Sequence, residues 1–171
     1  MIFLPSSKMN GFSTPPRTRI NRNGTLTSEL GLIRRKLNGT KKPWAVSGSM
    51  AMKLHANRIG VPLHRQPNDI DIVIRAQDYH IFIGALASIG YTTNKPPPIR
   101  FQHMKLTHGR FSIDLLAADS NLAPNITKTN IVVYDKTPVV KIRHLIRQKN
   151  RTLSNNNTSV ARQNRNFLKA L

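Results

Sequence analysis

Three aspartates lie in apolar stretches, where an ionised carboxylate is costly to bury. Asp69 and Asp71 open the stretch DIDIVI, and Asp114 lies inside FSIDLL. The chain of 171 residues has only seven acidic side chains, against 27 lysines and arginines. A basic protein that places three of so few carboxylates in apolar stretches is expected to use them for a specific purpose.

The spacing of these aspartates predicts a shared site. Asp69 and Asp71 are two residues apart, so on a strand both side chains leave the same face. Asp114 lies at the centre of a second apolar strand, which could pair beside the first. At about 4 Å each pair of carboxylates repels by about 4 kcal/mol at an effective dielectric near 20. We therefore expect a cation, and predict that Asp69, Asp71 and Asp114 are catalytic and bind Mg²⁺ or Mn²⁺. Ion pairs with nearby lysines or arginines are the simpler alternative.

Gly48 and Ser49 stand between a predicted strand and a predicted helix. Glycine permits a tight turn and a close approach of the backbone, and the N-terminus of the helix offers N–H groups and a positive dipole end to phosphates. Ser49 adds a hydroxyl donor. Each motif alone is weak evidence. Their succession, from strand to Gly-Ser to helix to the two aspartates and then to the lone Asp114, predicts that a nucleoside triphosphate (NTP) binds here.

The hydrophobic periodicity predicts an α/β fold with a mixed β-sheet and flanking helices. Helices are expected over 28–38, with Ser28 as N-cap, and over 49–58, 77–89, 139–150 and 160–171. Strands are expected over 43–47, 69–75, 100–106, 110–117 and 131–134.

Composition divides the chain into three parts. Residues 1–26 contain four basic residues and no acidic one, and are expected to form a flexible basic arm. A tail without a role is the alternative. Residues 27–151 are expected to form the core. Residues 152–171 are expected to form a polar loop and a basic C-terminal helix that packs on the core.

These motifs resemble the nucleotidyltransferase superfold, in the minimal form found in AbiEii-like proteins and in toxin–antitoxin nucleotidyltransferase toxins. The resemblance covers residues 44–149 and is carried by Gly48-Ser49, the two aspartates of DID and Asp114. It implies that Gly-Ser binds the nucleotide and that the first two aspartates hold metal. It also implies that the third aspartate completes the site and assists the attacking hydroxyl.

The resemblance extends to residues 137–149, which look like the strand-then-helix segment of that family. It implies that Lys149 reaches the triphosphate. From its spacing alone, a lysine whose stem covers the edge of the core is an equal alternative. Many family members carry an acidic helix after this lysine, whereas no acidic residue follows Asp135 in this chain.

The net charge of +20 indicates a polyanionic partner. Residues 136–171 carry nine basic and no acidic residues. An RNA acceptor gains from such a surface through counterion release, whereas a polycationic aminoglycoside would be repelled. The sequence therefore predicts transfer of a nucleoside monophosphate from an NTP to RNA, with the 3′ end of tRNA as the first candidate. An acidic inhibitor protein would also suit the charge, and a role as a toxin follows from the resemblance alone.

Two other functions stay open. One is a nucleic-acid-binding protein that keeps the fold without catalysis, and the other is a nucleotidyltransferase that acts on a protein or a small molecule. No apolar run is long enough to span a membrane, so we expect no membrane partner. The absence of cysteine is compatible with the cytoplasm.

Overall fold

The computed structural model describes residues 24–63, 66–96, 100–118, 123 and 125–153, with the side chains of 149–153 left out. Its elements in chain order are α1 (Leu26–Gly39), β1 (Trp44–Ser47), α2 (Gly48–Ile59), β2 (Ile70–Ile74), the 3₁₀ turn η1 (Ala76–Asp78), α3 (Tyr79–Ala87), β3 (His103–His108), β4 (Phe111–Ala117), β5 (Ile131–Tyr134), β6 (Thr137–Val140) and α4 (Ile142–Leu153). The predicted α/β fold with a mixed sheet is confirmed. The helix expected over 160–171 and most of the expected arm lie outside the described residues. In the part described, no helix combines the length and the apolar character needed to cross a membrane.

The six strands form one sheet in the order β3-β4-β2-β1-β6-β5. At its centre, β2 runs antiparallel to β1 and parallel to β4. Each side is completed by a hairpin, β3–β4 on one side and β5–β6 on the other. Because β1 pairs in parallel with β6, the sheet is mixed.

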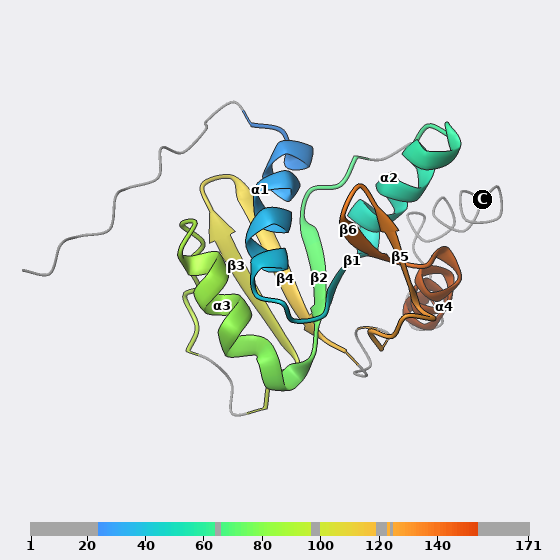
Figure 1. Ribbon diagram of the computed structural model, residues 1–171. Coiled ribbons are helices and arrows are strands. Elements are labelled where there is room, and N and C mark those ends of the chain that lie inside the picture. The colour runs from blue at the N-terminus through green and yellow to red at the C-terminus, as the bar shows by residue number, and fades with distance from the viewer. Residues whose placement is uncertain (1–23, 64–65, 97–99, 119–122, 124, 154–171) are drawn as a thin grey trace, which may run out of the picture.

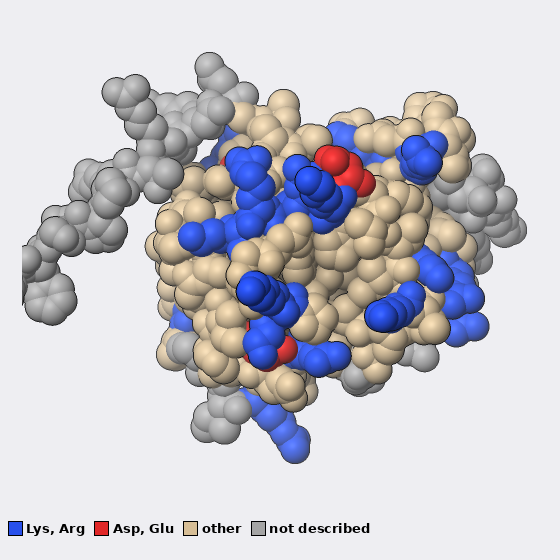
Figure 2. Space-filling model, viewed as in Figure 1, with Lys and Arg blue, Asp and Glu red and all other residues tan. Residues whose placement is uncertain are grey.

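Helices α1 and α3 pack against each other on one face of the sheet (Figure 1). The indole N–H of Trp44 donates to Asn38 Oδ1 of α1 at 3.0 Å. Trp44 pairs with Ile74, so this face also carries Ile70 and Ile72, all three isoleucines being fully buried. Figure 2 views the molecule from this side, where lysine and arginine side chains are numerous and acidic ones are few. Helix α2 contacts β1, β2 and α4.

Several predicted boundaries are wrong; the strand expected over 100–106, for example, is β3 and runs from His103 to His108. Two of the errors have clear local reasons. The first helix begins at Leu26, with Thr25 as N-cap accepting from the Ser28 N–H, so Ser28 lies in the first turn. The segment 139–140, assigned by periodicity to the helix expected over 139–150, belongs to β6, and α4 begins only at Ile142. The strand-then-helix order implied by the resemblance is therefore the right one. Val139 and Val140 suit a strand because β-branched side chains pack well on a pleated sheet.

His55 joins α2 to the β5–β6 hairpin. Its Nε2 lies 2.9 Å from the carbonyl oxygen of Val140, and its Nδ1 lies 2.8 Å from the hydroxyl oxygen of Tyr134. A carbonyl only accepts, so Nε2 carries the proton and Nδ1 accepts from Tyr134. The neutral ring thus satisfies both contacts. Burial lowers the pKa of His55, although its hydrogen bond to Val140 acts in the opposite direction.

This lowered pKa predicts that the protein loses stability on mild acidification. In the unfolded chain His55 titrates near 6.5, so between that pH and its lower folded pKa the unfolded state binds more protons. The free energy of unfolding should fall as the pH falls from 7.5 to 5.5. We expect His55→Gln, which can still donate to Val140, to be less stable at pH 7.5 but to show a flatter pH dependence in urea unfolding. The variant His80→Gln, at an exposed position, serves as control. A His55→Gln curve parallel to that of the wild type would contradict this account.

Candidate active site

The strand register brings two of the predicted site aspartates side by side. Asp71 of β2 is the Cα partner of Asp114 in the parallel strand β4, so both side chains leave the same face of the sheet. Asp69 lies two residues before Asp71, immediately ahead of β2. All three are partly buried, whereas the alternating Ile70 and Ile72 are fully buried on the opposite face.

The Gly-Ser turn lies directly beside Asp71. Ser47, the last residue of β1, pairs with Asp71, and Gly48 begins α2 with a φ of +59°. A Cβ built on Gly48 would lie 1.7 Å from Asp71 Oδ2. Only glycine leaves room for the carboxylate and adopts this backbone conformation without strain. Ser49 follows in the first turn of α2, where unpaired N–H groups are available.

Asp114 makes a contact that the sequence analysis missed. His103 Nε2 lies 2.8 Å from Asp114 Oδ1, with the His103 side chain 46% exposed and that of Asp114 only 16% exposed. Lys105, also on β3, is the direct cross-strand partner of Asp114. The alternation of β3, with Met104 and Leu106 buried and the residues between them exposed, was the available signal. This alternation identifies His103 and Lys105 as neighbours of Asp114 only once the register of the β3–β4 hairpin is known.

The carboxylates are not gathered around one point in this structure. Within the described ranges, no three histidine, aspartate or glutamate side chains lie close enough to hold one metal ion together. The Asp71 carboxylate lies against Gly48, and that of Asp114 binds His103. Carboxylate oxygens are the donors that Mg²⁺ and Mn²⁺ prefer, so the chemistry of the residues fits such an ion. Metal binding by Asp69, Asp71 and Asp114 stays a prediction.

Helix α4 reaches the end of β1 beside the Gly-Ser turn. The Ser47 hydroxyl donates to Gln148 Oε1 at 3.4 Å. Lys149 is the next residue of α4, so its backbone lies near the site, and its side chain lies outside the described residues. Its predicted contact with a triphosphate therefore stays a prediction.

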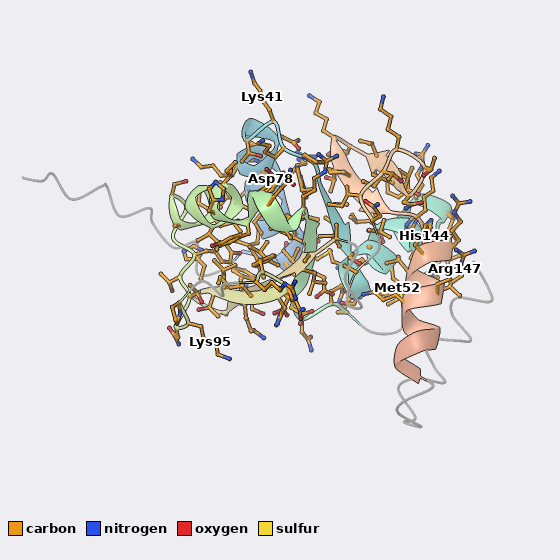
Figure 3. The ribbon with its side chains drawn as sticks, turned by 90° about the horizontal axis from the view of Figure 1, so that it is seen from below. Lys41, Met52, Asp78, Lys95, His144 and Arg147 are labelled. Atoms are coloured by element: carbon orange, nitrogen blue, oxygen red, sulfur yellow. The ribbon has the colours of Figure 1, made fainter. Side chains whose placement is uncertain are left out.

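The first half of α4 borders a hollow of about 300 Å³ that is separate from the aspartates. It is lined by His55, Val132, Tyr134, Lys141, Ile142 and Arg143. His144 and Arg147 lie on α4 at the end of the molecule away from α3 (Figure 3). Burial and the positive charges of Arg143, Arg147 and Lys141 lower the pKa of His144. This end of the molecule is therefore strongly basic, and none of the three aspartates lines the hollow.

This chain has a mixed sheet with a Gly-Ser turn beside two strands that each carry an aspartate on one face, and its fold is shared with solved nucleotidyltransferases. Solved structures with this fold match the chain over most of its length. The structure of ANT(2″)-Ia in complex with adenylyl-2″-tobramycin has a TM-score of 0.62 at 14% identity, covering 85% of this chain and 88% of that one. The lincomycin-bound lincosamide antibiotic adenylyltransferase LnuA has a TM-score of 0.60 at 18% identity, covering 86% of this chain and 98% of that one.

No family model and no curated protein matches the sequence. The resemblance inferred from the motifs is thus confirmed at the level of the fold. The AbiEii-like subtype stays a prediction.

The contact between Gly48 and Asp71 predicts that Gly48→Ala destabilises the protein. An alanine in the left-handed region costs about 1–2 kcal/mol, and its methyl group would also have to displace the Asp71 carboxylate. Urea unfolding should therefore show a loss of at least that size. Gly84→Ala is the matched control, because Gly84 lies inside α3 and a methyl group added there would meet nothing within 4 Å. It should raise stability by up to about 1 kcal/mol. Equal unfolding free energies for Gly48→Ala and the wild type would refute the close contact between Gly48 and Asp71.

Proposed function

We propose that the chain is a divalent-metal-dependent nucleotidyltransferase that transfers a nucleoside monophosphate from an NTP to a hydroxyl of RNA. The observation that carries this proposal is the pairing of Asp71 with Asp114 next to Gly48, whose positive φ and close approach to the Asp71 carboxylate favour glycine. Together with the fold, this supports a phosphate-binding role for the turn, beside two carboxylates on one face of the sheet.

Each site residue has a role in this reaction. The N-terminus of α2, with Gly48 and Ser49, binds the triphosphate, and Lys149 adds a positive charge. Asp69, Asp71 and Asp114 hold Mg²⁺ or Mn²⁺, which neutralises charge on the departing pyrophosphate when bound. The acceptor oxygen bonds to the α-phosphorus, and the bond from that phosphorus to the bridging oxygen of the β-phosphate breaks. Asp114 is our candidate for the base that receives the hydroxyl proton.

Charge favours RNA over an antibiotic as acceptor. The two structural neighbours are antibiotic complexes, and a small-molecule acceptor is therefore the second candidate. A net charge of +20 repels a polycationic aminoglycoside and attracts RNA. The 3′ end of tRNA is the first RNA to test. A toxin restrained by an acidic inhibitor in the cytoplasm is the biological setting that the motif resemblance suggests.

The test is nucleotide transfer by the purified full-length chain. The protein is incubated with Mg²⁺ or Mn²⁺, total RNA and each α-³²P-labelled NTP in turn. We expect labelled RNA with at least one NTP and a loss of about 100-fold or more for Asp71→Asn, since metal binding contributes several kcal/mol. Asp135→Asn is the matched control, because Asp135 is exposed, has a φ of 43° that asparagine tolerates, and pairs with Arg34.

Three outcomes would contradict the proposal or its acceptor. If Asp71→Asn labels RNA as well as the wild type, the site is wrong. Labelling of tobramycin or lincomycin in place of RNA would identify the small-molecule alternative. RNA binding without metal-dependent NTP binding in calorimetry would identify a non-catalytic RNA-binding protein.

A further inference from the structure

Across the face that carries the aspartates, the strands set the site's components in a fixed order. The Gly48 turn lies at the end of β1, Asp71 follows on β2, Asp114 on β4, and the outward residues of β3 come last. In this register Lys105 lies opposite Asp114, and Thr107 lies opposite Ser112. One end of the row thus holds the phosphate-binding turn, and the other end holds β3.

We propose that the outward row of β3, His103, Lys105 and Thr107, is the acceptor-binding edge of the site and holds the sugar-phosphate backbone of RNA beside the reacting hydroxyl. The inference rests on the proposed function, and it assigns a surface to the acceptor that the motifs leave open.

The direction of the reaction supports this assignment. In phosphoryl transfer the attacking and leaving oxygens lie roughly in line on opposite sides of the phosphorus. If pyrophosphate leaves toward Gly48 and the N-terminus of α2, the acceptor hydroxyl must arrive from the opposite side of the aspartates. That side is occupied by β4 and β3.

The chemistry of the row fits a phosphodiester backbone. His103, Lys105 and Thr107 are all exposed. Lys105 and Thr107 can donate hydrogen bonds to phosphate oxygens, whereas His103 Nε2 is already bonded to Asp114. Cross-strand partners lie about 5 Å apart, which brings the Lys105 stem next to Asp114. Among the residues the structure describes, Lys105 has no ion-pair partner. The Asp114 carboxylate next to it binds His103 instead. Its ammonium group is therefore available to a phosphate.

Because β3 lies at the edge of the sheet, a long ligand such as RNA can reach its exposed side chains. In the described sheet β3 is an edge strand, and beyond it only an isolated bridge joins Thr92 to Thr107. The basic residues of α1 are on the other face, since α1 packs on the side of Trp44 and the buried isoleucines. They add to the general attraction for RNA and cannot touch an acceptor at Asp114. Lys36, exposed in the last turn of α1, provides a matched control.

The test compares Lys105→Gln with Lys36→Gln. Binding of a fluorescein-labelled tRNA is followed by anisotropy between 50 and 200 mM KCl, without NTP or added metal. Loss of one phosphate contact should weaken binding by Lys105→Gln and reduce the slope of log K against log salt by about 0.7–0.9. Lys36→Gln should keep the wild-type slope, and Lys105→Arg should restore it. In the transfer assay the KM for RNA should rise for Lys105→Gln, with the KM for NTP unchanged.

Two results would overturn the inference. If Lys36→Gln and Lys105→Gln lose affinity and slope equally, binding is spread over the whole basic surface. A raised KM for NTP with an unchanged KM for RNA would assign Lys105 to the triphosphate. Because the anisotropy arm needs neither NTP nor turnover, failure of transfer in the wild type counts against the proposed function, and loss of the Lys105 effect on RNA binding counts against the acceptor edge.

Discussion

The close contact between the Asp71 carboxylate and the backbone of Gly48 is the constraint on which the candidate site depends. It requires β1 to end at Ser47, α2 to begin in a left-handed conformation, and β2 to pair with β1 in one register. A shift of that register by one residue would turn the aspartates into the core and the isoleucines outward. The packing of α1 and α3 over the isoleucine face therefore also fixes which face carries the carboxylates.

The two carboxylates on the paired strands β2 and β4 have different neighbours in the structure. Two carboxylates side by side on parallel strands repel at short range when both are ionised, and each of these two lies next to a different partner. Asp114 binds His103, and Asp71 lies at the N-terminus of α2, where the helix dipole favours an anion. That N-terminus is also the place proposed for phosphate. Under the proposed function a triphosphate and Asp71 would compete for one positive end unless a cation joined them, so the proposed phosphate site and the proposed metal site depend on each other.

The period-two alternation in DIDIVI was enough to predict that Asp69 and Asp71 share a face, because alternation is a local property of a strand. The pairing of Asp71 with Asp114 joins segments 43 residues apart in sequence, so local patterns could only suggest it. His103 was missed for the same reason, since its contact depends on the register of a hairpin. The N-cap was predicted at Ser28, whereas the structure has it at Thr25, because a threonine three residues earlier can also cap the helix. At 139–140, pairing with β1 and β5 outweighed a periodicity that could extend the helix.

The positive charges of the protein lie on several surfaces, and only some of them lie close enough to Asp114 to bind an acceptor there. Basic side chains lie on the α1 and α3 face (Figure 2), along α4, and on the outward face of β3. At physiological salt, charges separated by more than about 8 Å of solvent are largely screened, so the α1 face can raise the rate of encounter with RNA without holding it at Asp114. The groups that act on a bound acceptor must lie on the carboxylate face. There, Lys105 is the cross-strand partner of Asp114, and in the proposed reaction it is the group that would bind a phosphate of the acceptor and repel a polycation.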